Sequence, residues 1–163
     1  RALKDVLDAL GEDSRAVFKS GISKDSWVSF RSVRELMRQV DAKLGRDDMY
    51  LVLECGRAGA EGAFDLLRQI KPPQPPPEVL VSEMPNLGPR VMRGIDFQVK
   101  RVGRGYGRLE LIEQGEPSLH SCVATLGFMD RSLDRIGAAE VEVTLLSCQA
   151  LGDESCLMDL SWL

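Results

Sequence analysis

The chain has 163 residues, of which 44% are hydrophobic, and this is enough for one domain with its own core. Its 21 basic and 25 acidic residues are spread along the sequence and give a net charge of −4, which argues against a nucleic-acid-binding surface. We expect residues 1–163 to form a single domain. No membrane span is expected, because no apolar run approaches the roughly 20 residues that cross a bilayer.

The first third of the sequence has the apolar spacing of helices. One or two short helices are expected within the first twenty residues, with a break near Gly11. A longer helix is predicted over residues 27–44, where apolar residues recur every three or four positions. Asp25 or Ser26 is the expected cap of this helix, and Gly45 is expected to end it.

A third helix is predicted from about Asp47 to Ile70, and its centre is rich in small residues. Gly56, Gly59 and Gly62 each cost a helix about 1 kcal/mol relative to alanine. Such a cost is tolerated where another element must come close. We therefore expect a neighbouring element to approach this helix at its glycines.

Five prolines in six positions, over residues 72–77, exclude a helix or a central strand and predict an extended connection. Helical spacing resumes over residues 78–93, and we expect this helix to be interrupted at Pro85 and Pro89. Because the first half of the chain has no strand to close a core, the connection is not expected to separate two domains.

The second half of the chain alternates apolar and polar residues, which is typical of strands. A β-hairpin is predicted over residues 97–111 around Gly103, Gly105 and Gly107. A helix follows over 117–137, and a second hairpin is predicted over 141–162. The order of helices, hairpin, helix and hairpin predicts the α+β class, with a roughly four-stranded antiparallel sheet and helices on one of its faces.

Residues that could catalyse a reaction are scarce. The single histidine, His120, lies two positions before Cys122, and side chains so spaced on a helix point about 200° apart, which disfavours a dyad. The sequence Gly103-Arg104-Gly105-Tyr106-Gly107 is followed by a strand rather than the helix of a dinucleotide-binding motif. No carboxylate pair is placed as an acid and base pair would be, and Glu110 and Glu113, which flank the end of a predicted strand, are expected on a solvated face. We expect the protein not to be an enzyme.

The cysteines give the most specific chemical signal. Four are present, too few and too widely spaced for a secreted disulfide framework, so we expect a cytoplasmic protein. Cys148 and Cys156 flank the turn of the second hairpin and can face each other, and Cys122 approaches them if its helix packs on the sheet. These three thiols could hold zinc with His120 or a carboxylate such as Glu154 as fourth ligand. The alternative is that they are ordinary buried cysteines, without a cofactor.

The segment from Cys148 to Cys156 resembles the C-terminal signature of 4-vinyl reductase-type domains, which are ligand-sensing modules. The match consists of a cysteine, a Gly-Asp turn and a second cysteine eight positions on. Cys122, twenty-six positions before Cys148, matches a further zinc-binding cysteine of those sensors. Their glutamate ligand corresponds to Leu145 here. The resemblance therefore implies a zinc site that lacks one family ligand.

The rest of the chain resembles an uncharacterised family of myxobacterial proteins, distantly related to 4-vinyl reductase-type domains, to haem-nitric-oxide-binding-like folds and to small subunits of vesicle-tethering transport particles. The helix over 27–44, the segments 54–60 and 105–111, and the ending Asp159-Leu160-Ser161-Trp162 carry this resemblance. It implies an α+β domain that pairs with itself or with a protein partner, commonly within a larger signalling protein. It does not carry a haem ligand over to His120.

These observations predict a non-catalytic sensory or regulatory domain that binds a small hydrophobic ligand, a protein partner or both. The chain's start at Arg1 with immediate helical spacing predicts a longer parent protein. The alternative is a pure interaction and dimerisation module with a filled core and no small ligand. Aromatic residues are the candidates for lining a ligand pocket: Trp27, Phe30, Tyr106, Phe128 and Trp162.

Overall fold

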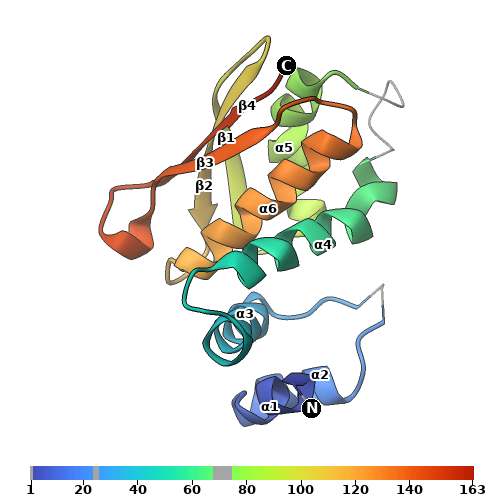
Figure 1. Cartoon of the computed structure of the whole chain (residues 1–163), viewed down its shortest axis with the longest axis vertical. Coiled ribbons are helices and arrows are strands. Elements are labelled where there is room, and N and C mark those ends of the chain that lie inside the picture. Colours follow the sequence, from blue (N-terminus) through green and yellow to red (C-terminus); the bar gives the residue numbers. More distant parts are fainter. Residues whose placement is uncertain (1, 24–25, 68–74) are drawn as a thin grey trace.

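The computed structural model describes residues 2–23, 26–67 and 75–163, and its chain folds into helices packed on a sheet, with a helix between the two pairs of strands in the sequence (Figure 1). Asp25 and residues 68–74, with the predicted end of the third helix and most of the proline run, lie outside this description. The helices are α1 (Ala2–Asp8), α2 (Glu12–Lys19), α3 (Phe30–Leu44), α4 (Tyr50–Leu67), α5 (Pro77–Val91) and α6 (Leu119–Arg135). The strands are β1 (Ile95–Gly103), β2 (Tyr106–Glu113), β3 (Glu142–Ser147) and β4 (Cys156–Ser161), and a short 3-10 helix, η1 (Gln149–Leu151), precedes β4.

The four strands form one antiparallel sheet in the order β1-β2-β4-β3, so the second hairpin adds its last strand beside β2. The β1–β2 turn contains Gly105 at φ +80°, a left-handed conformation that favours glycine. Gly107 faces Val81 of α5, and a Cβ at this position would lie 2.9 Å from a Val81 methyl carbon. Glycine is therefore favoured at both positions, by the backbone conformation at 105 and by the close approach of α5 at 107. The antiparallel four-stranded sheet with its helices confirms the predicted α+β class.

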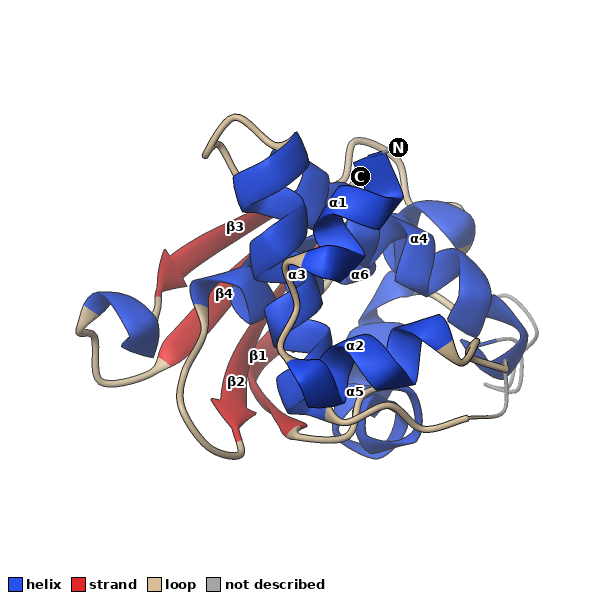
Figure 2. Ribbon diagram, turned by 90° about the horizontal axis from the view of Figure 1, so that it is seen from below, coloured by secondary structure: helices blue, strands red, loops and turns tan. Residues whose placement is uncertain are grey.

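The helices gather on one side of the sheet (Figure 2). Helix α5 packs on β1, and α6 packs on β3. The opposite face of the sheet is polar and carries ion pairs between Lys100 and Glu110 (2.6 Å) and between Arg108 and Asp159 (2.5 Å). This two-sided pattern follows from the period-2 alternation along each strand. No helix in the described part of the chain is long and apolar enough to span a membrane.

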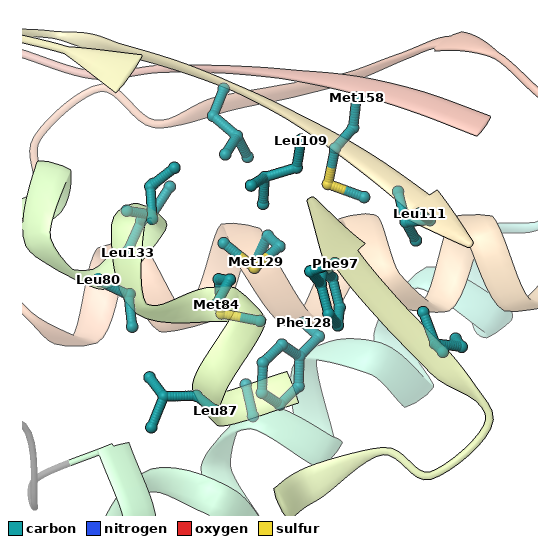
Figure 3. Close-up of a cluster of buried hydrophobic side chains, with 14 of the residues drawn as sticks. Leu80, Met84, Leu87, Phe97, Leu109, Leu111, Phe128, Met129, Leu133 and Met158 are labelled. Carbon is teal, nitrogen blue, oxygen red and sulfur yellow. The ribbon is translucent and has the colours of Figure 1, made fainter. Parts of the chain in front are cut away.

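The main core lies between the sheet and helices α5 and α6 (Figure 3). Its fully buried side chains interdigitate from both layers, as in other close-packed interiors. They include Leu80, Met84, Leu109, Leu111, Met129, Leu133, Met158 and Leu160. Helices α1 and α2 lie away from this core and pack on α3, which in turn contacts α4 and α6.

Two helix predictions need correction. Helix α3 begins at Phe30 rather than near Trp27, because the Ser29 hydroxyl accepts a hydrogen bond from the Ser32 amide and caps the helix there. Helix α5 continues through Pro85 and Pro89 instead of being interrupted at them. Burial of its apolar face against the sheet compensates for the two backbone hydrogen bonds that these prolines cannot donate.

Candidate functional site: three thiols and a buried carboxyl

Three cysteines from separate elements meet in the interior. Cys122 lies on α6, Cys148 directly follows β3, and Cys156 begins β4. Their sulfur atoms all lie within 4.8 Å of one another, and none of the three side chains is exposed. The Cys148 thiol donates to the Cys122 sulfur at 3.6 Å. The predicted convergence of these thiols is therefore present, and Cys55 stays apart on the surface.

The turn between β3 and β4 is built to hold two of these sulfurs. Gly152 ends η1 at φ +100°, which reverses the chain within a few residues. The Asp153 carboxylate accepts a hydrogen bond from the Cys148 amide at 2.7 Å and so fixes the backbone there. The Gln149 amide donates to the Cys156 sulfur at 3.2 Å. An N–H directed at a sulfur favours its thiolate form, which is the form that binds metals.

Glu113, the last residue of β2, brings a carboxyl group to the same place. Its side chain is 8% exposed, and its Oε1 accepts from the Cys122 thiol at 3.8 Å. Its Oε2 is buried without a hydrogen-bond partner. Burial raises the pKa of this carboxyl to about 7, although the positive charge of Arg34 opposes the rise. A buried acid with an unsatisfied oxygen beside the Cys122 thiol is suited to ligate a cation.

The sequence contained a signal for Glu113 that the strand-end interpretation missed. In β2, Leu109 and Leu111 point into the core, and Glu113 continues their period-2 series. A charged residue at a core-facing strand position needs a compensating partner. Treating Glu113 as part of a solvated strand end, together with Glu110, hid this position.

The donor set of this cluster matches a structural zinc site. Zinc binds cysteine sulfur and carboxylate oxygen in four-coordinate closed sites, and thiolates select such soft or borderline ions. Burial raises the pKa of the Cys122 and Cys156 thiols, so without a metal they hold their protons. A cation would have to displace these protons. The three thiols therefore fit a zinc ion, and Glu113, which contacts Cys122, is the candidate for its fourth ligand.

The two fourth ligands considered from the sequence lie elsewhere. The Nε2 atom of His120 is 3.7 Å from an Asp41 carboxylate oxygen, beside a polar groove of about 1250 Å³. His120 and Cys122 are two residues apart on α6, so one faces α3 and the other faces the sheet. Glu154 is exposed in the turn before β4. Neither side chain belongs to the cluster of thiols.

The five aromatic residues proposed to line a ligand pocket lie in different surroundings. Phe128 and Trp162 are buried in the main core. Phe30 is half-buried at its margin, whereas Trp27 and Tyr106 are exposed by 50% and 37%. None of the five lines either of the two hollows described in the structure, whose linings are mostly polar or charged.

Solved structures of similar shape were found, although no family model and no curated protein matches the sequence. An Fe(II) unliganded H-NOX protein from K. algicida superimposes with a TM-score of 0.68 and 11% identity, covering 99% of this chain and 86% of that one. An H-NOX protein from S. oneidensis in its Fe(II)NO state gives 0.64 and 12%, covering 99% and 96%. An oxygen-binding H-NOX domain related to soluble guanylate cyclases gives 0.62 and 14%, covering 98% and 90%.

The chain shares the fold of H-NOX domains. This likeness raises the question of haem, because one of the similar structures concerns haem redox potential. The only histidine of the chain, His120, is paired with Asp41 at a polar groove. The apolar space between α5 and the sheet is packed with Leu80, Met84 and Phe97 (Figure 3). These residues do not fit a haem, and the thiol cluster is the better candidate site.

Proposed function

We propose that this chain is a non-catalytic sensory or regulatory domain that holds a structural zinc ion at Cys122, Cys148, Cys156 and Glu113. The observation that carries the proposal is the meeting of three buried thiols, one of which contacts a buried carboxyl with an unpartnered oxygen. The H-NOX-like fold supports the sensory part, since similar structures include gas-liganded domains. A reducing cytoplasm would keep the thiols available for the metal.

The role assigned to the metal is to join parts of the domain that are distant in sequence. Glu113 ends β2, Cys122 lies on α6, and Cys148 and Cys156 flank the last turn. Because the unfolded chain does not hold these four groups together, the free energy of metal binding adds to the free energy of folding. The ion would thereby fix the position of the sheet relative to α6.

The regulatory input is proposed to be a small hydrophobic ligand or a protein partner, within a longer signalling protein. A ligand held by Phe128 and Trp162 would have to expand the core, because both side chains are already packed there. A second candidate function is therefore a protein-interaction or homodimerisation module. The exposure of Trp27 and Leu151, by 50% and 68%, favours it. Native mass spectrometry distinguishes a co-purified small molecule from a bare dimer.

The zinc site is tested by metal content. Protein purified without chelator is expected to contain one zinc per chain, and Cys148→Ser is expected to lose it. Glu113→Gln should weaken zinc binding by roughly 10- to 100-fold, the usual cost of losing a group that contacts a metal ligand. Glu154→Gln and His120→Asn serve as matched controls and should bind as the wild type does. Zinc-free wild-type protein that also fails to take up added zinc would exclude the site.

A further inference from the structure

The N-terminal helices form a layer with buried side chains of its own, separate from the main core. Helices α1, α2 and α3 lie together below α4 and α6 in Figure 1. The buried side chains of Val6 and Leu10 lie outside the main core cluster. Within the described residues, Phe30 is the one side chain of this layer that packs against that cluster. Polar contacts also join the layer to the rest of the chain, namely Arg34 with the Glu116 carbonyl and Asp41 with His120.

One of these polar contacts is made to the loop between β2 and α6. The Arg34 guanidinium of α3 donates a hydrogen bond to the backbone carbonyl of Glu116. It also lies close enough to Glu113 for its positive charge to oppose the raised pKa of that carboxyl. In the described part of the chain, it forms no ion pair within 4.0 Å. Arg34 is thus a half-buried cation in contact with the loop between Glu113 and Cys122.

The loop that Arg34 contacts connects two of those ligands. Glu113 ends β2, residues 114–118 form the loop, and Cys122 lies in the first turn of α6. Binding a metal to Glu113 and Cys122 would fix both ends of the loop whose middle Arg34 contacts. It would also change the charge there, because a divalent ion held by three thiolates and a carboxylate leaves the cluster anionic. Arg34 is attracted to an anionic cluster more strongly than to neutral thiols.

We propose that Arg34 is a positioning residue that couples the metal site to the N-terminal layer, so that loading the site tightens the docking of α3. This inference rests on the proposed function, since it requires a metal at the thiol cluster. The proposed coupling connects the zinc site to the layer of helices α1–α3, which contributes none of the zinc ligands. The contact that carries this coupling is the one between Arg34 of α3 and the loop at Glu116.

Hydrogen–deuterium exchange of the full chain, with and without added zinc, tests the coupling. In the wild type, zinc is expected to slow amide exchange over residues 30–44 by about threefold, the scale of a partly exposed charge interaction. Arg34→Gln should bind one zinc as before and lose this protection. Arg34→Lys should retain part of it. Arg38→Gln, an exposed arginine one turn along the same helix, should behave as the wild type.

The outcomes separate this inference from the proposed function. If zinc binds with full stoichiometry and exchange over residues 30–44 is unchanged, the coupling is wrong and the zinc site stands. The same conclusion follows if Arg34→Gln shows the full zinc-dependent protection. If zinc does not bind to the wild type, both the site and the coupling are excluded.

Discussion

Gly56 of α4 lies directly against the backbone carbonyl of Ala124 in α6. A Cβ at position 56 would be only 1.8 Å from that oxygen, and one at Gly127 would be 2.0 Å from the Leu53 carbonyl. The two helices therefore cross with their backbones in contact, which only glycine permits. This contact sets the short distance between α4 and α6, and α6 carries Cys122.

Replacing Gly56 with alanine is expected to destabilise the protein by at least about 2 kcal/mol, because the added methyl group forces the helices apart. Gly59→Ala is the matched control, since a Cβ there meets nothing within 4 Å. It should be neutral or stabilise by up to about 1 kcal/mol through better helix propensity. Urea unfolding of both variants measures the difference. Equal midpoints for the two would show that α4 and α6 do not make this close contact.

The N-terminal cap of α3 gives a second stability prediction. Ser29→Ala should cost about 1 kcal/mol, because it removes the hydroxyl that accepts from the Ser32 amide. Ser26→Ala should have little effect, since the Ser26 side chain is exposed and bonds to Ser23. Thermal unfolding of the two variants distinguishes them. A larger loss for Ser26→Ala would instead support the cap position expected from the sequence.

The sequence pattern predicted the sheet, the helices and the meeting of the three thiols, because each depends on local periodicity and on hairpin geometry. The close approach at Gly56 was also predictable, since glycine is costly in a helix. Gly59 and Gly62 meet nothing within 4 Å, and which glycine forms the contact depends on tertiary packing. The role of Glu113 was hidden for a related reason. The alternation along β2 indicates its burial only if the strand continues to residue 113, and the alternation alone does not decide where the strand ends.

Zinc is expected to stabilise the folded protein measurably. At a free zinc concentration one hundred times the dissociation constant, the gain is about 2.7 kcal/mol, or roughly 5–10 °C in melting temperature for a domain of this size. Chelator should reverse the shift. Cys148→Ser should abolish it, whereas Cys55→Ser, at an exposed cysteine outside the cluster, should retain it. A zinc-dependent shift that persists in Cys148→Ser would place the metal elsewhere.

Glu113 also predicts how the stability of the metal-free protein depends on pH. Its pKa is about 7 in the folded chain, compared with an ordinary value of 4.5, because burial disfavours the carboxylate. Between these pH values the folded state holds a proton that the unfolded state has released. The free energy of unfolding should therefore decrease as pH rises from about 4.5 to 7, by about 3 kcal/mol in total from this group. The Glu113→Gln variant lacks this titration, so its stability should exceed that of the wild type increasingly over the same interval. Urea unfolding of both metal-free proteins at several pH values measures the difference, and parallel curves would mean that Glu113 is not a buried acid.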